Sequence, residues 1–290
     1  YPLTNAEFVL FDEAQDANPV MLAMLADYPG QVIYVGDSCQ QIYEWRGAVD
    51  ALDRLPVELA RTSLTQSWRF GQAVADVANV VLTELGSDLL LTGNPAITST
   101  VHATTQAPTA RAVLCRTNAV AVESLLNYQA QGLDVHLVGG HEEIVRFAQA
   151  AARLQAGEQV THPDLSCFTS WQEVREYVAD DPGGSDLRTM VKLLDDYGPQ
   201  IVMDALAGTI GEDQADVLVS TAHRAKGREW PVVRLAGDFA DNDTGQLPAP
   251  ELRLLYVAAT RAAEHLDIRQ CQALRLLLVA ETGRARAAAQ

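Results

Sequence analysis

The sequence predicts an α/β fold built on parallel sheets, and two observations indicate this class. Short apolar runs such as FVLF at residues 8–11 read as strands covered on both faces, which is typical of parallel sheets. These runs alternate with segments whose apolar residues recur at helical spacing. The 290 residues, 48% of them hydrophobic, can bury a substantial core, and this length suggests two domains, or one domain with an insertion.

The first predicted strand runs directly into the acidic sequence DEAQD at residues 12–16. Acids at the carboxyl end of a buried strand lie where open α/β sheets bind their ligands. The pair Asp12 and Glu13 could hold a hydrated Mg²⁺ and orient a water molecule against a phosphoryl group. The alternative is a helix N-cap, since Asp12, Glu13 or Asp16 could cap a helix that begins near Pro19, although one cap needs only one acid.

The next segments continue the alternation of helices and strands. Residues 19–28 read as a short helix that Pro29-Gly30 ends, and residues 31–35 read as a second buried strand. Residues 93–109 are rich in Thr, Ser, Pro and Ala and read as a surface connection. Between them, an amphipathic helix that starts at the sequence LTQSWRF is indicated by apolar residues at intervals of three and four: Phe70, Val74, Val77, Val81 and Leu85.

The second half of the chain resumes the same rhythm around one interruption. Residues 155–216 break the rhythm and contain the polar sequence ADDPGGSD, so we expect a small helical insertion there. The other segments read as strands at 112–115, 135–138, 217–220, 232–235 and 265–268, and as helices at 119–131, 142–154, 252–263 and the C-terminal tail.

Composition excludes several classes of protein. The net charge of −17 argues against a surface that coats nucleic acid generally, because phosphates are contacted mainly by Lys and Arg, and leaves room only for a narrow basic groove. The four cysteines lie far apart without Cys-x-x-Cys spacing, which argues against a zinc site or a disulfide framework and favours a reduced, cytoplasmic protein. No apolar run approaches the roughly 20 residues of a membrane helix, so we expect no membrane partner.

Five motifs, taken in order, resemble those of the UvrD/Rep-type DNA helicases of superfamily one, and the resemblance covers nearly the whole chain. LFDEAQD looks like the Walker B motif of that family, and VGDSCQQIYEWRGA looks like its third motif. LTQSWR is similar to the fourth, VSTAHRAKGREW to the fifth and ELRLLYVAATRA to the sixth. Within the family, the QQIY wording and the short insertion resemble the F-box DNA helicase branch. The resemblance implies the RecA-like parallel-sheet domains of a P-loop NTPase.

The resemblance also implies roles in ATP hydrolysis. Asp12 would hold Mg²⁺ through water, and Glu13 would position or deprotonate the attacking water. Gln40 would sense the γ-phosphate, and Arg69 and Arg261 would be arginine fingers supplied by the second RecA-like domain. The residues implied to bind the ATP cofactor are Trp68, stacked on the adenine, Glu229, accepting from a ribose hydroxyl, Gly227 and Arg46.

For DNA, the resemblance implies a single-strand track beside the nucleotide. Tyr43 and Trp45 would stack on bases, and such stacking is worth about 1–3 kcal/mol per base and tolerates any sequence. Thr221, His223 and Lys226 would contact phosphates or couple the two sites. The implied partners are single-stranded DNA and DNA junctions.

Taken singly, these residues have plainer interpretations. Trp68 alone would be a packing residue, Arg69 a surface or capping residue and His223 a satisfied histidine, while HRAKG would be a solvated basic turn. Five motifs in the family's order favour the functional interpretation.

The sequence contains no G-x-x-x-x-G-K-[ST] loop, the element that cradles the β- and γ-phosphates of a bound nucleotide. We therefore expect the rear portion of a helicase. Its first RecA-like domain would be incomplete at residues 1–60, and the second would comprise 61–154 and 217–290, interrupted by the insertion at 155–216. The first domain should expose a sheet edge and apolar faces, and should need an upstream segment or separate chain that carries the loop.

The predicted function is an ATP-dependent DNA helicase or translocase, or the rear part of one, with ATP and Mg²⁺ as cofactors. Movement from 3′ to 5′ is implied by the resemblance alone. Two alternatives stay open. One is a non-catalytic subunit that binds single-stranded DNA or a partner protein, and the other is one half of a split helicase whose other half supplies the loop.

Overall fold

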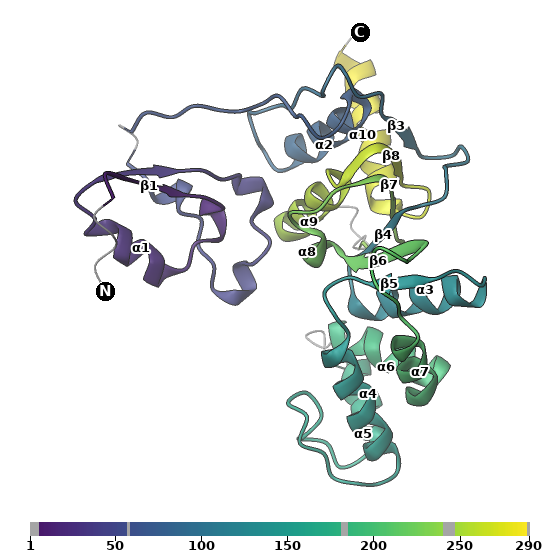
Figure 1. The fold of residues 1–290 in the computed structure, drawn as a ribbon. Coiled ribbons are helices and arrows are strands. Elements are labelled where there is room, and N and C mark those ends of the chain that lie inside the picture. Colours follow the sequence, from purple (N-terminus) through teal and green to yellow (C-terminus); the bar gives the residue numbers. More distant parts are fainter. Residues whose placement is uncertain (1–5, 57–58, 181–184, 240–246, 289–290) are drawn as a thin grey trace.

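The computed structural model describes residues 6–56, 59–180, 185–239 and 247–288. We call residues 6–56 the first lobe and the other described residues the second lobe; Figure 1 shows the first lobe standing to one side of the second. In the first lobe, strands β1 (Phe8–Phe11) and β2 (Gln31–Tyr34) pair in parallel and are connected through helix α1 (Pro19–Ala26). The 3₁₀ turns of this lobe are η1 (Ala14–Asp16), η2 (Ser38–Gln40), η3 (Glu44–Arg46) and η4 (Leu52–Arg54).

The second lobe is built on a six-stranded parallel sheet with the strand order β3-β8-β7-β4-β6-β5. This architecture confirms the predicted α/β class and is that of a RecA-like fold. The strands are β3 (Thr100–His102), β4 (Ala112–Cys115), β5 (Val135–Leu137), β6 (Val217–Thr221), β7 (Trp230–Leu235) and β8 (Ala262–Asp267).

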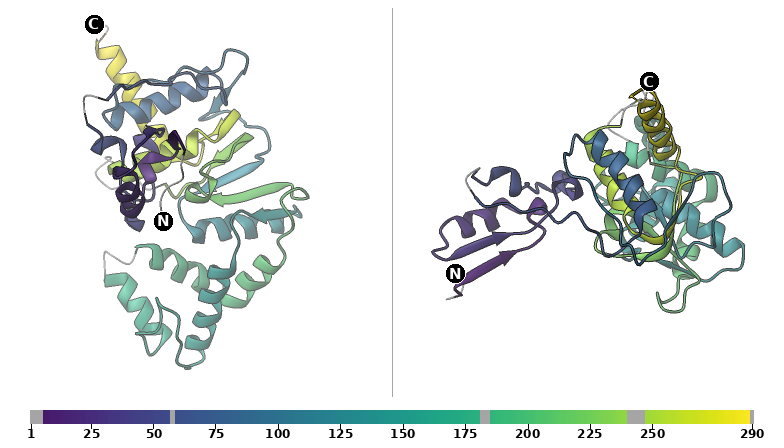
Figure 2. Two further views of the ribbon diagram at one scale, coloured as in Figure 1. Left: turned by 60° about the vertical axis from the view of Figure 1, so that its left-hand side comes forward. Right: turned by 90° about the horizontal axis from the view of Figure 1, so that it is seen from above.

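Helices cover both faces of this sheet (Figures 1 and 2). Within the described residues, no helix is long and apolar enough to cross a bilayer. One core cluster joins the sheet to α2 (Gln72–Glu84), α8 (Ala222–Ala225), α9 (Ala249–Ala259) and α10 (Gln272–Ala288). The other joins it to α3 (Asn118–Ala130), α4 (Glu142–Gln155), α5 (Trp171–Asp180), α6 (Ser185–Tyr197) and α7 (Pro199–Ala207).

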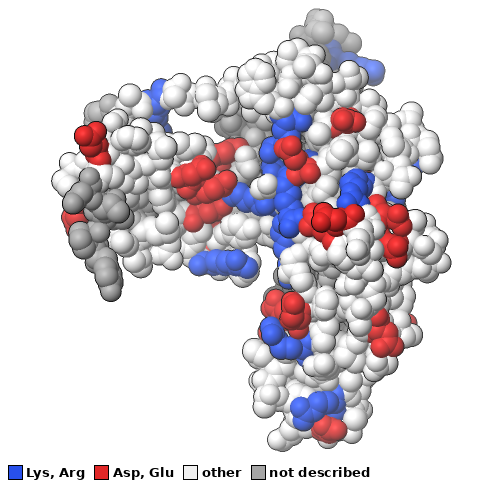
Figure 3. All heavy atoms as spheres, viewed as in Figure 1, with Lys and Arg blue, Asp and Glu red and all other residues white. Residues whose placement is uncertain are grey.

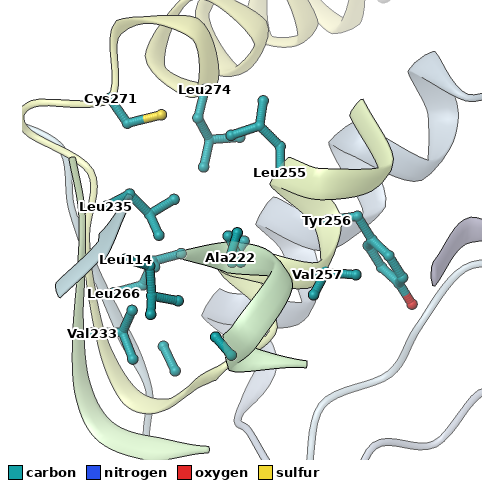
Figure 4. Packing of buried hydrophobic residues seen from close by; sticks show 14 of the residues in the cluster. Leu114, Ala222, Val233, Leu235, Leu255, Tyr256, Val257, Leu266, Cys271 and Leu274 are labelled. Carbon is teal, nitrogen blue, oxygen red and sulfur yellow. The ribbon is translucent and has the colours of Figure 1, made fainter. Parts of the chain in front are cut away.

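Strand β4 shows why its sequence is apolar at every position. Successive side chains of a strand point to opposite faces of the sheet. Ala112 and Leu114 belong to the core cluster with α2 and α9, whereas Val113 and Cys115 belong to the cluster with α3 and α4. All four residues are at most 2% exposed. Figure 4 shows Leu114 among side chains of β7, β8 and α9, so this face of the sheet is packed across several elements.

Residues 155–216 contain α5, α6 and α7, in line with the helical segment predicted there. Asp195 on α6 binds α5 twice, because its carboxylate accepts from Trp171 Nε1 at 2.7 Å and forms an ion pair with Arg175 at 2.8 Å. The part ADDPGGSD of the predicted insertion includes residues 181–184, which lie outside the described residues. The domain boundaries of the insertion stay a prediction.

Four local predictions were wrong. The strand at 8–11 was expected to be covered on both faces and the strand at 31–35 to be buried, but Phe8 is 53%, Leu10 63% and Ile33 39% exposed, because the small core cluster of the first lobe covers one face only. Residues 93–109 contain β3, a short strand whose pairing with β8 depends on the second lobe as a whole. Helix α9 ends at Ala259 instead of 263, because the chain continues directly into β8.

Candidate functional site

The acidic sequence after β1 forms a tight turn at the junction of the two lobes. Glu13 adopts a left-handed backbone conformation (φ 53°, ψ 41°), and it is the only described residue other than glycine with a positive φ. Such a conformation costs on the order of 1–3 kcal/mol and is common at functional sites. The cap of α1 is Asn18, whose Oδ1 accepts from the Val20 N–H at 2.8 Å. The capping interpretation of Asp12, Glu13 and Asp16 is therefore wrong.

Gln15 connects the two loops that follow β1 and β2. Its Nε2 donates to Glu13 Oε2 at 2.5 Å, its Oε1 accepts from the Asp37 N–H at 3.0 Å, and the residue is 1% exposed. The Asp37 carboxylate in turn accepts from Gln40 Nε2 at 2.8 Å and from the hydroxyl of Tyr256 at 3.1 Å. Gln40 is therefore held in place by Asp37, which is itself bound to α9 of the second lobe.

Lys226 joins the lobes at the acidic turn. Its side chain is 9% exposed, and its Nζ lies 2.9 Å from Glu13 Oε2, donates to the Gln40 carbonyl at 3.2 Å and forms an ion pair with Asp16. Burial alone would lower the pKa of Lys226, but its bonds to Asp16 and Glu13 outweigh burial and raise it. The interpretation of HRAKG as a solvated basic turn is wrong, because this lysine is buried between acids.

The contact with Lys226 also changes the pKa of Glu13. Burial alone would raise the pKa of this carboxyl group. The hydrogen bond and the charge of Lys226, with smaller contributions from Gln15 and the charge of Arg261, outweigh burial and hold the pKa below its ordinary value of 4.5. Glu13 is therefore ionised at neutral pH, as a residue that accepts a proton from water must be.

Arg69 and Arg261 lie near one another on the second lobe. Arg261 is 1% exposed, and its guanidinium donates to two backbone carbonyls and to the hydroxyl of Thr260. Burial and the neighbouring charge of Arg69 lower the pKa of Arg261 to about 9. Burial also lowers the pKa of Arg69, whose Nε is buried without a hydrogen-bond partner.

Neither arginine forms an ion pair with another of the described residues, although Arg261 interacts electrostatically with Glu13 across the junction. Burying a positive charge without an anionic partner is costly. In Figure 3, acidic side chains of the first lobe face a column of Lys and Arg side chains on the second. The junction therefore brings carboxylates and unpaired guanidiniums to opposite sides of one site.

A group of aromatic and basic side chains lies beside this junction. The guanidinium carbon of Arg46 lies 4.6 Å from the ring centroid of Trp45 and 5.3 Å from that of Tyr43. The hydroxyl of Tyr43 donates to the carbonyl of His223 on α8 at 2.9 Å. Trp45 is 69% exposed. Tyr43 thus spans the two lobes, while Trp45 keeps a broad apolar surface in contact with solvent.

Trp68 and Glu229, two predicted nucleotide contacts, belong to the second lobe. Trp68 neighbours Arg69 in the sequence, and Glu229 lies near both arginines in the folded chain. Trp68 directly precedes Arg69 and is 76% exposed, so the interpretation of Trp68 as a packing residue is wrong. Glu229 is exposed and interacts electrostatically with both Arg69 and Arg261. Both side chains can reach a ligand from solvent.

Thr221 and Gly227 occupy positions with clear structural roles. Thr221 is 6% exposed, and its Oγ1 accepts from the Arg224 N–H at 3.4 Å, which caps the short helix α8. Gly227 adopts φ +80°, a conformation that favours glycine, directly after Lys226. These two positions set the path of the loop that delivers Lys226 to the first lobe.

The acidic turn fits a magnesium ion that binds together with a nucleotide. Asp12 is exposed, and one of its carboxylate oxygens accepts from the Glu13 N–H at 2.8 Å. Among the residues described, no group of three or more His, Cys, Asp and Glu side chains could hold a metal by itself. Mg²⁺ needs only one or two carboxylates when waters and phosphate oxygens supply its other ligands.

Four residues of this junction were not among the predicted site residues: Gln15, Asp16, Asp37 and Tyr256. Asp16 shares Lys226 with Glu13, and Asp37 binds Gln40 and Tyr256. A signal for Asp37 was present in the sequence, because this acid follows β2 as Asp12 follows β1. Tyr256 carried no such signal, because its part in the site depends on how α9 packs.

Comparisons with known proteins match this chain to UvrD-like helicases. The family model "UvrD/REP helicase N-terminal domain" matches residues 3–52, and the model "UvrD-like helicase C-terminal domain" matches residues 216–268. The chain is 26% identical to F-box DNA helicase protein 1 of Schizosaccharomyces pombe, over 90% of this chain and 33% of that protein. It is 28% identical to F-box DNA helicase 1 of Gallus gallus, over 92% of this chain and 29% of that protein.

A bacterial relative extends the match. The chain is 27% identical to the ATP-dependent DNA helicase UvrD2 of Mycobacterium tuberculosis, over 89% of this chain and 46% of that protein. It thus spans about a third of the length of the F-box helicases and less than half of UvrD2. Both family models match in the order expected, and these matches are consistent with a UvrD/Rep-type helicase of superfamily one.

Proposed function

We propose that this chain forms part of an ATP-dependent DNA helicase or translocase, with the nucleotide held between its two lobes. The observation that carries the proposal is the interaction of Glu13 with Arg261 across the junction, with Arg69 beside Arg261 on the second lobe. Buried Arg261 and half-buried Arg69, which form no ion pair with another described residue, lie near acids that suit Mg²⁺, and this charge distribution fits a nucleoside triphosphate. Two such charges side by side have no evident use in a module that only binds DNA.

Each residue of this site acts through charge or position. Glu13 positions or deprotonates the attacking water, and Asp12 would hold Mg²⁺, which would neutralise phosphate charge when bound. Arg69 and Arg261 stabilise the charge on the transferring phosphoryl group. Gln40 senses the γ-phosphate, and its carbonyl contact with Lys226 links that sensor to the second lobe. The nucleotide site is completed by Trp68 on the adenine, Glu229 on the ribose, Gly227 and Arg46.

A single strand of DNA binds beside this site. Trp45 and Tyr43 are the aromatic platforms, and the exposure of Trp45 supports this role. His223 and Lys226 contact phosphates or couple the two sites, and buried Thr221 acts through the loop that it caps. Movement from 3′ to 5′ and action at DNA junctions are proposed from the family alone.

The phosphate loop comes from a partner segment in this proposal, either upstream in the same polypeptide or on a separate chain. Two features support it. The sequence contains no G-x-x-x-x-G-K-[ST] loop, and the first lobe exposes the apolar side chains of Phe8, Leu10 and Ile33 on its two-stranded sheet.

The four free cysteines are in keeping with a reducing, cytoplasmic compartment.

The test is ATP hydrolysis stimulated by single-stranded DNA. The 290-residue chain is assayed alone and together with a loop-bearing upstream segment. Under the condition that supports turnover, Glu13→Gln should reduce kcat by about 10²–10⁴-fold, and Arg261→Lys by a comparable factor. The matched control is Glu176→Gln, an exposed residue of α5, which should leave turnover unchanged.

The outcomes separate the alternatives. Turnover that appears only when a separate loop-bearing protein is added identifies a split helicase. An absence of turnover under both conditions, with binding to single-stranded DNA intact, identifies a non-catalytic subunit. Turnover that survives Glu13→Gln would place the catalytic carboxylate elsewhere and reject the proposed site.

A further inference from the structure

The insertion at residues 155–216 carries a charge imbalance that the nucleotide and DNA sites leave unexplained. It contains thirteen Asp and Glu residues and three Lys and Arg residues, which accounts for more than half of the net charge of −17. Nearly all of the acids that the structure describes there are exposed. A surface of this charge repels nucleic-acid phosphates and attracts basic ligands.

A cavity of about 590 Å³ opens on the same part of the molecule, between α4, α5, α6 and the segment 156–170. Volumes of roughly 300–1,000 Å³ are typical of ligand sites. Tyr177 at the cavity is 41% exposed, so the cavity is open to solvent. Its lining is mainly apolar and includes Ile144, Phe147, Phe168, Leu187 and Met190.

Acidic side chains and one histidine line the cavity together with its apolar residues. Glu143 and Asp164 are among the lining residues, and the described lining includes neither Lys nor Arg. His162 Nδ1 accepts from the Asp164 N–H at 3.3 Å, and its ring lies edge-on to that of Phe147, with centroids 5.4 Å apart. This bond places the proton of a neutral imidazole on Nε2. The cavity therefore combines an apolar floor with a negative rim.

We propose that this cavity docks a basic amphipathic segment of another protein. Apolar side chains of the segment enter the cavity, and its Lys and Arg side chains pair with Glu143, Asp164 and the surrounding acids. Aromatic and methionine side chains suit such docking, because they adapt to apolar groups of different shapes. DNA and free nucleotides are disfavoured, since their phosphates would face carboxylates. This site is independent of the nucleotide junction.

The first measurement uses two defined probes. Both are fluorescein-labelled amphipathic helical peptides of about 18 residues, a length at which helices become stable in water. One combines Leu with Lys, and the other has Glu in place of every Lys. Fluorescence anisotropy with the whole chain should detect binding of the Lys peptide and little binding of the Glu peptide. Equal binding of both peptides would overturn the charge argument.

Variants then locate the binding. Met190→Glu places a charge in the cavity and should weaken the Lys peptide by at least about tenfold. Asp164→Asn should weaken it by about threefold. Asp196→Asn is the matched control, because it removes the same charge from an exposed position of α6 outside the cavity lining. Equal effects of Asp164→Asn and Asp196→Asn, with no effect of Met190→Glu, would reject docking in the cavity.

Cys167 provides a readout that needs no substitution. This cysteine is exposed and lines the cavity, whereas Cys115 and Cys271 are buried. The Lys peptide should slow alkylation of Cys167, measured by mass spectrometry of its proteolytic fragment. Unchanged alkylation at saturating peptide would overturn the proposal. Protection by single-stranded DNA instead would identify a nucleic-acid site, and self-association abolished by Met190→Glu would identify a second copy of the chain as the occupant; either result rejects the proposed partner.

Discussion

The two lobes differ in how much apolar surface they bury, although both are built from parallel strands. All residues of β4 in the second lobe are at most 2% exposed. In the first lobe, Phe8 and Leu10 of β1 are 53% and 63% exposed, and the buried core cluster consists of three alanines. Apolar burial contributes roughly 25 cal/mol per Å² to folding, so most of the stability must come from the second lobe.

The candidate site therefore joins a well-packed part of the molecule to a weakly packed one. Arg69 and Arg261 belong to the second lobe, whereas Glu13 belongs to the first. The first lobe is held in place by polar contacts at Lys226 and by Ile42, which is buried in the core cluster of the second lobe. Elements of low local stability are those that move in binding and catalysis, so we expect the first lobe to be the mobile half.

The largest effect should come from the second-lobe core. Leu114→Ala should lower the free energy of unfolding by about 2–5 kcal/mol, because this side chain is fully buried. Leu10→Ala should change it by less than about 0.5 kcal/mol, because Leu10 is largely exposed. Thermal and urea denaturation measure both. Equal losses from the two variants would show that the first lobe has a core of its own.

A smaller effect is expected from the lysine between the lobes. Lys226→Met should lower the free energy of local opening of the first lobe by about 2 kcal/mol, because Asp16 is left buried without its partner. Hydrogen exchange of the amides of β1 measures this opening, with β4 as the internal reference. The matched control is Lys192→Met at an exposed position of α6. Unchanged exchange of β1 would show that Lys226 does not hold the lobes together.

The hydrogen bond from Tyr43 to the His223 carbonyl should contribute less. Tyr43→Phe keeps the ring and removes only the hydroxyl, so we expect a loss of about 1 kcal/mol in the same exchange measurement. The double variant Tyr43→Phe/Lys226→Met tests whether the two contacts hold the lobes together independently or cooperatively. A loss equal to the sum of the single losses would mean that the contacts act independently.

The ion pair between Glu13 and Lys226 should hold the first lobe against the second only within a range of pH. The pKa of Glu13 is held below 4.5, so its contribution is present above that pH and is lost as the pH falls through the lowered value. The pKa of Lys226 is raised above 10.5, so its contribution is present below that pH and is lost as the pH rises through the raised value. Exchange protection of β1 should therefore fall at both extremes and stay level between them. In Glu13→Gln the acid-side loss should shrink.

The smallest effect is expected at the exposed rim of the junction. Arg253 lies 3.6 Å from Glu44, whose side chain is 65% exposed, and solvent screens such a pair. Arg253→Gln should leave both the melting temperature and the exchange of β1 within experimental error. Faster exchange of β1 in this variant would show that the exposed pair Arg253–Glu44 also holds the first lobe against the second.

Much of the fold could be predicted from local patterns. Strand β4 is apolar at each position, and α2 carries its apolar residues on one face, so both were found close to their observed bounds. β3 could not be found, because its three residues lie in a polar, Pro-containing segment and pair with β8 only once the sheet is assembled. The exposure of β1 could not be deduced from its letters, since burial depends on what packs against a strand.

The residues of the candidate site likewise include some that local motifs indicated and others that they did not. Local motifs named Glu13, Arg69 and Arg261, and the structure brings the charges of Glu13 and Arg261 together across the junction. The assignment of their catalytic roles stays a prediction. The motifs did not indicate that Gln15 and Asp37 form the support beneath Gln40 and Glu13, because such support comes from side chains that meet only in the folded chain.

The sequence alone therefore determined the α/β class, the order of most elements and the identity of the charged residues after the strands, because periodicity and residue chemistry are local properties. Which of those charges meet depends on the tertiary packing of the chain. Lys226 and Asp16 are 210 positions apart in the chain, yet they form one ion pair. Their meeting depends on the packing of α8 and α9 against the sheet and of Ile42 against the second lobe, and no short stretch of sequence encodes that packing.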